Sequence, residues 1–168
     1  MTTKVATFLA HSIAMENEAA ERYDELASVM EVHNNPEVAV LFHQMAEFSR
    51  LHAASVKSRA VGYQLPQLKS WEYRWNTPEP PEVGVVDGTH YMMTPYHALE
   101  FALANERRGH DFYAGEAAGS DDPEVRRLAT EMAEEEAEHV EELEEWIART
   151  PKPAINWKED PDPVSVID

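Results

Sequence analysis

The residues of this sequence best suited to chemistry are polar side chains that interrupt otherwise apolar stripes. Four segments carry apolar residues at three- and four-residue steps, the period of an amphipathic helix. A buried carboxylate is costly unless it is paired or bound to a metal, so several at one level of a bundle need a cation among them. Carboxylate oxygen together with imidazole nitrogen suits iron, manganese or zinc. The interruptions, in chain order, are Glu16, then Ser49 and His52, then Glu106 and His110, then Glu136 and His139.

The last of these pairs has the spacing of two ligands to one centre. Glu136 and His139 are three residues apart, and side chains at that spacing differ by about 60° in direction around a helix. The surrounding stretch, 131–142, is strongly acidic, and an acidic helix produces this spacing by accident. A second, independent pattern is therefore needed to favour metal binding over a solvated helix face.

An internal repeat supplies that pattern. One block recurs after 87 residues and an upstream block recurs after 90, so the loop between the blocks differs by three residues. Two related helical hairpins are the simplest explanation. The repeat aligns Ser49 with Glu136. The matched pairs are Pro36 with Pro123, Met45 with Met132, His52 with His139, Glu16 with Glu106, and Tyr23 with Tyr113.

The periodicity predicts four helices, near 4–30, 36–60, 95–118 and 123–149. Asn35 and Asp122 precede prolines that suit a first helical turn, and both can cap the helices that follow. The long connection, about 61–94, contains prolines, glycines and three aromatic residues, so we expect a strap that packs along the bundle. Short, long and short connections predict an all-α four-helix bundle with one crossover, between helices two and three.

The domain organisation expected is one bundle over residues 1–150 and an extended tail over 151–168. The tail is acidic and contains four prolines, and we expect Ile155 and Trp157 to hold part of it against the bundle. A chain of 168 residues is the size of a single domain.

Composition excludes several function classes. The chain has no cysteine, which rules out disulfides, thiolate metal sites and a cysteine nucleophile. A formal net charge of −18 makes nucleic acid an improbable partner, because such a surface repels phosphate. The mean hydropathy is −0.54 and no apolar run approaches the roughly 20 residues that span a bilayer. The start of the chain lacks the features of a signal peptide, so we expect a cytoplasmic protein with no membrane partner.

Over residues 5–149 the sequence resembles the ferritin-like di-iron carboxylate superfamily, and in particular rubrerythrins. A Glu from each of two helices and Glu-x-x-His from the other two form the ligand set of that superfamily. The resemblance implies metal ligands at Glu16, His52, Glu106, Glu136 and His139. It also implies a ferritin-like bundle that holds iron, most simply two ions, with manganese or zinc as other possibilities. The implied activity is Fe(II) oxidation coupled to reduction of peroxide or oxygen.

The sequence departs from the rubrerythrin pattern at three points. Ser49 stands where the second-helix Glu is expected, which removes a carboxylate that bridges the two metals. Glu47 does not replace it, because a side chain five residues before His52 points about 140° away from the His52 side chain around the helix. Gly109 stands where rubrerythrins carry an extra Glu, with His110 next to it. Rubrerythrins usually end in a cysteine-rich rubredoxin domain, and a chain with no cysteine needs an external electron donor.

These departures leave several readings of the site and of the function open. Two metals bind if water or His110 fills the position left by Ser49, or one metal binds through Glu106, Glu136 and His139, or the residues form a structural polar cluster. The corresponding functions are a peroxidase or ferroxidase-type oxidoreductase and a non-catalytic or mononuclear iron-handling protein. A third reading is an interaction module that docks through its acidic tail. The resemblance and the aromatic residues of the strap also favour a homodimer.

Overall fold

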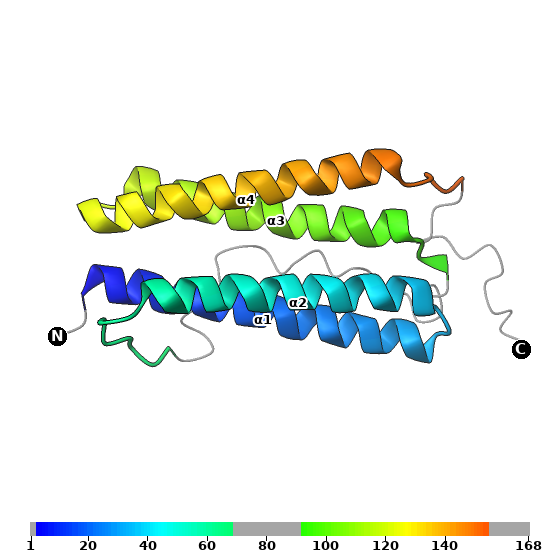
Figure 1. Cartoon of the computed structure of the whole chain (residues 1–168), viewed down its shortest axis with the longest axis horizontal. Coiled ribbons are helices and arrows are strands. Elements are labelled where there is room, and N and C mark those ends of the chain that lie inside the picture. The colour runs from blue at the N-terminus through cyan, green and yellow to red at the C-terminus, as the bar shows by residue number, and fades with distance from the viewer. Residues whose placement is uncertain (1–2, 69–91, 155–168) are drawn as a thin grey trace, which may run out of the picture.

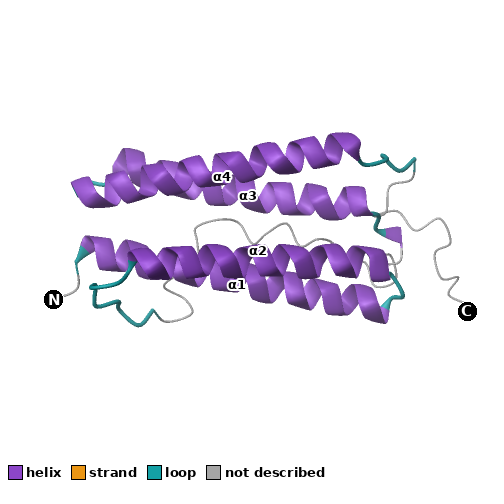
Figure 2. Cartoon of the chain, viewed as in Figure 1, coloured by secondary structure: helices purple, strands orange, loops and turns teal. Residues whose placement is uncertain are grey.

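The computed structural model describes residues 3–68 and 92–154, and within these ranges it consists of four long helices joined by loops (Figure 2). The helices are α1 (Lys4–Val32), α2 (Pro36–Arg59), α3 (Pro95–Gly119) and α4 (Pro123–Arg149). The four expected helices are therefore confirmed, to within about two residues at each end. None of the helices in the described part of the chain has the length and apolarity needed to cross a membrane.

Local sequence explains where α1 and α4 begin. The Thr3 hydroxyl accepts a hydrogen bond from the amide of Ala6 at 3.0 Å, and the Asp122 carboxylate accepts from the amides of Glu124 and Val125. Such caps satisfy amides that have no partner within the helix, and each contributes about 1 kcal/mol. The expected cap is thus present at Asp122.

The expected cap at Asn35 is not formed. The Asn35 side-chain amide instead donates to the carbonyl of Met93 at 2.7 Å, and Pro36 supplies the preset first turn of α2. The bond joins the turn between α1 and α2 to the segment that enters α3. Just before it, Asn34 adopts a positive φ of 58°, which asparagine tolerates better than most residues.

The helices form two antiparallel hairpins that lie one over the other (Figure 1). α1 packs along α2, and α3 packs along α4. α2 ends near the start of α1, whereas α3 begins at the opposite end of the bundle (Figure 1). The chain must therefore run the length of the bundle between α2 and α3, as the predicted crossover requires. Trp71, Tyr73 and Trp75, expected in the strap, and Ile155 and Trp157 of the tail lie outside the described residues.

The core consists of two apolar clusters, one towards each end of the bundle. One includes Tyr23, Phe42 and Leu99, and the other includes Phe8 and Met132. Between the two clusters lie the side chains of the candidate site. The buried polar residues of the described chain are Ser12, Glu16, Ser49 and Glu136.

Candidate metal centre

Each helix delivers its polar residues to the same level of the bundle. α1 contributes Glu16, α2 contributes Ser49 and His52, α3 contributes Glu106, and α4 contributes Glu136 and His139. The apolar stripes on both sides fix the rotation of each helix, so the polar residues within the stripes must face inward. This is the physical reason that the interruptions identified in the sequence, apart from His110, converge.

Four of the five predicted ligands form one tight cluster. His52, Glu106, Glu136 and His139 each offer a ligand atom, and these atoms all lie within 4.8 Å of one another. Ligands bound to one transition metal at about 2.0–2.2 Å are roughly 3–4.4 Å apart. The side chains are therefore almost in position around a cation. Whether they bind a metal remains a prediction.

Glu16, the fifth predicted ligand, lies beside this cluster. Its Oε2 is 3.6 Å from Nδ1 of His52, and its Oε1 accepts a hydrogen bond from the Tyr113 hydroxyl at 3.4 Å. On the other side, Nδ1 of His139 lies 3.8 Å from Oε2 of Glu106 and 3.6 Å from Oε2 of Glu136. His52 therefore lies beside one carboxylate, Glu16, whereas His139 lies beside two, Glu106 and Glu136.

The two histidines lie face to face. Their ring centroids are 4.2 Å apart and the planes differ by only 10°. The His52 side chain is 21% exposed and the His139 side chain is 30% exposed, whereas Glu16 and Glu136 are 8% and 7% exposed. The carboxylates therefore lie at the inner side of the centre, and the histidines lie nearer its opening to solvent.

The buried carboxylates of the centre are not all ionised near neutral pH. Burial, and then the neighbouring Glu136, raise the pKa of Glu106 well above its ordinary value. The pKa of Glu136 is raised to about 7, chiefly by burial and also by the charge of Glu16, against a lowering effect of its hydrogen bond with Glu106. Near neutral pH this pair therefore retains a proton, since two adjacent buried carboxylates disfavour double ionisation.

The pKa of the histidine on α2 is raised as well. Burial disfavours the charged form of His52, but the hydrogen bond and the charge of Glu16, helped by the Glu106 charge, outweigh it and raise the pKa of His52. The centre thus attracts positive charge, whether as protons or as a metal ion.

Two buried atoms in the described chain support a metal over protons alone. Glu136 Oε2 and His139 Nδ1 face each other, and neither has a hydrogen-bond partner among the described residues. A buried polar atom without a partner costs about 1–3 kcal/mol, and a shared cation would satisfy both. Two carboxylates and two imidazoles are donors that iron, manganese and zinc accept. The residues present therefore fit the metal that the sequence predicts.

The two departures from the rubrerythrin pattern also lie at the centre. Ser49 is 3% exposed, so its small side chain is buried in the bundle at the position where a carboxylate is expected. A Cβ built on Gly109 would lie 3.5 Å from Cδ of Glu136, so the Gly109 backbone packs directly against that carboxylate. Glu47, as predicted, points elsewhere: its side chain is 66% exposed and pairs with Arg50.

His110, considered as an extra ligand, is not brought into the cluster. Its side chain is 38% exposed, and its Nδ1 lies 3.4 Å from the Asp111 carboxylate. Sequence reasoning missed the ion pair between Arg59 of α2 and Glu135 of α4, which joins the two helices that carry the histidines. Nothing in the periodicity pointed to it, because both residues occur on acidic or mixed helix surfaces.

Comparison with known proteins agrees with this architecture. The family model described as Rubrerythrin matches residues 7–80. The crystal structure of an uncharacterized conserved protein from Magnetospirillum magnetotacticum MS-1 is similar to this chain, with 55% sequence identity and a TM-score of 0.69. That match covers 92% of this chain and 100% of the other chain. A search of curated proteins found no match.

Proposed function

Because the chain belongs to the rubrerythrin-related proteins of the ferritin-like superfamily, we propose that it binds iron between its helices and oxidises Fe(II) with peroxide or oxygen. The observation that carries this proposal is the pair of stacked histidines, with Glu16 beside His52 and both Glu106 and Glu136 beside His139. The rings are 4.2 Å apart, similar to the spacing of about 3.5–4 Å between the ions of two-metal sites.

Each residue has a distinct role in this proposal. Glu16 with His52 would hold one ion, Glu106 with His139 would hold the other, and Glu136 would lie between them. The Tyr113 hydroxyl donates to Glu16 and so fixes the orientation of that carboxylate. Iron, when bound, supplies the electrons for reduction of the oxidant, and an external donor restores them.

The side chains around the centre suit a small oxidant. The partly exposed edges of His52 and His139 provide an approach from solvent, while the apolar clusters on both sides exclude bulk water. The proton retained by the Glu106–Glu136 pair is displaced when metal binds, so metal binding is expected to release protons.

A second candidate function is a non-catalytic or mononuclear iron-handling protein. The four-atom cluster supports it, because His52, Glu106, Glu136 and His139 can converge on a single ion. The small side chains at positions 49 and 109 support it as well, since both remove carboxylates that two ions would use.

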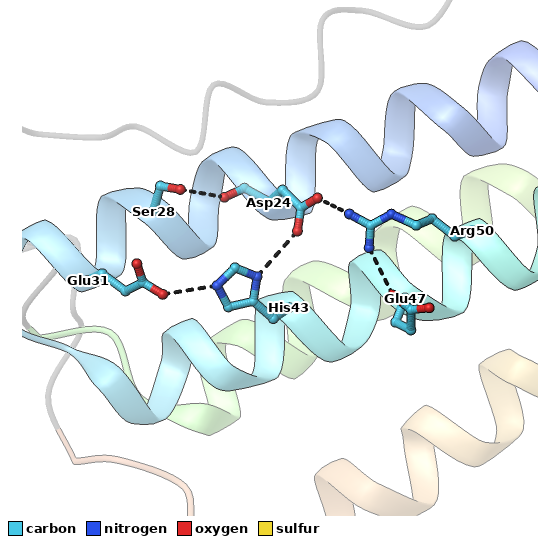
Figure 3. A network of polar contacts seen from close by, with 6 residues as sticks. All are labelled: Asp24, Ser28, Glu31, His43, Glu47 and Arg50. Atoms are coloured by element: carbon cyan, nitrogen blue, oxygen red, sulfur yellow. Dashed lines mark hydrogen bonds and ion pairs between the residues drawn. The ribbon is translucent and has the colours of Figure 1, made fainter.

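Anaerobic Fe(II) titration followed by peroxide or oxygen tests the proposal. We expect two irons per chain and oxidation faster than that of free Fe(II), with His139→Ala losing both properties. His43→Ala is a matched control, because His43 lies on the α1–α2 surface (Figure 3). One iron per chain with no accelerated oxidation would favour the second candidate function over the first.

A further inference from the structure

An ion pair that the proposed chemistry does not use joins the two helices that carry the histidines. Arg59 of α2 pairs with Glu135 of α4, and Arg59 also donates a hydrogen bond to the Ser55 hydroxyl at 3.0 Å. The Arg59 side chain is 23% exposed, whereas the Lys and Arg side chains in the other ion pairs of the described residues are 45–62% exposed. Arg59 is therefore held more deeply than the other paired cations of the described chain.

The helical register places this pair beside the edge at which the histidines reach solvent. Glu135 precedes His139 by four residues, so both side chains lie on the same face of α4, one turn apart. Arg59 follows His52 by seven residues, which again gives the same face of α2. α2 ends and α4 begins at the same end of the bundle (Figure 1), so both steps run in the same direction from the histidines.

Among the described residues, the approach from solvent to the centre lies at this edge. Along the bundle, apolar clusters close the centre on both sides, and in the cluster nearer Arg59 the side chains of Val56 and Met132 are buried. An ion does not cross such packing, because the loss of its hydration costs too much free energy. The rings of His52 and His139 are partly exposed, so an ion from solvent meets them first.

The two charges of the pair act on an approaching cation in opposite ways. The Glu135 carboxylate attracts the cation, and the Arg59 guanidinium repels it. The Glu135 charge already reaches the centre, since it is among the charges that raise the pKa of His52 and of Glu136. A carboxylate four residues before a histidine can also share an ion with it, because side chains at that spacing meet on the helix surface. While Arg59 holds Glu135, that carboxylate is not available to an ion.

We propose that Glu135 is the first ligand for an incoming divalent cation, and that Arg59 holds this carboxylate when no ion is entering. Glu135 binds the ion together with His139, and the buried carboxylates of Glu106 and Glu136 then replace Glu135 as oxygen ligands. The ion pair thus sets how fast metal enters and leaves the centre, and not how many ions the centre holds. The inference rests on the proposed function, because it needs a centre that binds metal.

A purely structural ion pair would behave differently on substitution. If the pair only joined the two hairpins, loss of either partner would leave metal uptake unchanged. Under the proposal, the two single substitutions change uptake in opposite directions. Arg59→Gln releases Glu135 and removes a repelling charge, whereas Glu135→Gln leaves the Arg59 charge unpaired at the edge.

Stopped-flow uptake of Co(II) by the metal-free chain, followed through the visible absorption of the bound ion, tests the proposal without an oxidant. At low salt we expect Arg59→Gln to raise the association rate by about threefold or more, and Glu135→Gln to lower it by about threefold or more. Both differences should shrink at high salt, because salt screens partly exposed charges. The number of Co(II) ions bound per chain at saturation should be the same in all variants.

Arg107→Gln and Glu144→Gln are the matched controls. Arg107 and Glu144 form an exposed ion pair between α3 and α4, and these substitutions change the net charge by the same amounts. Arg59→Lys keeps the charge and should leave uptake close to that of the wild type. Circular dichroism shows whether each variant is folded. Glu135 is 47% exposed, so Glu135→Gln still tests the proposal if Arg59→Gln does not fold.

The proposal is overturned if both substitutions leave the association rate unchanged, or if they shift it in the same direction. It is equally overturned if the control pair reproduces the effect. In each of these cases Co(II) still binds, so the proposed metal centre is unaffected. A wild-type chain that binds no Co(II) would instead overturn the proposed function, and this proposal with it.

Discussion

The stability of the metal-free protein should depend on pH through Glu136. Its pKa is raised from 4.5 to about 7, chiefly by burial. Because the folded state binds this proton more tightly than the unfolded state, the raised pKa favours folding below about pH 4.5. That contribution is lost as the pH rises towards 7. A shift of about 2.5 units corresponds to roughly 3 kcal/mol, at about 1.4 kcal/mol per unit.

Urea unfolding of the metal-free protein between pH 4.5 and 7.5, with a chelator present, measures this dependence. The wild type is expected to lose about 3 kcal/mol of unfolding free energy across the range, beyond the loss caused by its general negative charge. Glu136→Gln removes one carboxylate of the coupled Glu106–Glu136 pair, so its stability should fall less with pH and should exceed that of the wild type at pH 7.5.

Glu138→Gln is the matched control, because Glu138 lies two residues away on the exposed side of α4. It changes the net charge by the same amount without altering the buried cluster. His52, whose raised pKa also favours folding at low pH, is present in all three proteins and cancels in the comparison. Parallel pH profiles for the wild type and Glu136→Gln would refute the argument that burial places a proton on this carboxylate.

Three further predictions concern position 49, the apolar core and the surface between α1 and α2. Ser49→Glu restores a carboxylate at a buried position of the bundle, so we expect tighter iron binding by about tenfold or more, measured by anaerobic titration. Unchanged affinity would show that position 49 does not face the metal. Phe42→Ala should lower the unfolding free energy by about 3–5 kcal/mol in urea, because Phe42 is fully buried, and a loss below about 1 kcal/mol would contradict its place in the core. His43→Gln should lower the unfolding free energy by less than about 1 kcal/mol at pH 5.5 and should not change it at pH 8.5. Glu31 and Asp24 raise the pKa of His43, so the stabilisation is lost as the pH rises through that pKa. Equal effects at both pH values would exclude the charged pairing.

Much of the fold and of the candidate site was accessible from sequence, for a physical reason. A helix that packs in a bundle must repeat its apolar residues every three to four positions, and a polar residue at one of those positions must face inward. Glu136 and His139 were therefore recognisable in the sequence as interruptions of an apolar stripe. The repeat that aligns them with Ser49 and His52 made accidental spacing in an acidic helix a poor explanation.

The absence of the expected cap at Asn35 shows that a tertiary contact can override a local sequence rule. Asparagine before proline is a good helix cap, yet its amide bonds to Met93, which is 58 residues away in the chain. The Asn35 side chain can cap α2 or bond to the distant carbonyl of Met93, and the packing of the bundle favours the second. The sequence alone does not show that contact.

The sequence by itself determined the four helices, their pairing into two related hairpins and the side chains that interrupt the core. These follow from periodicity and repetition, which are properties of the chain. Only the tertiary structure decided that His52 and His139 stack at 4.2 Å, that Tyr113 donates to Glu16, and that His110 stays outside the cluster. It also showed that Arg59 of α2 pairs with Glu135 of α4. These facts depend on how helices from distant parts of the chain rotate and approach one another, and periodicity fixes a helix's inner face without fixing its neighbours.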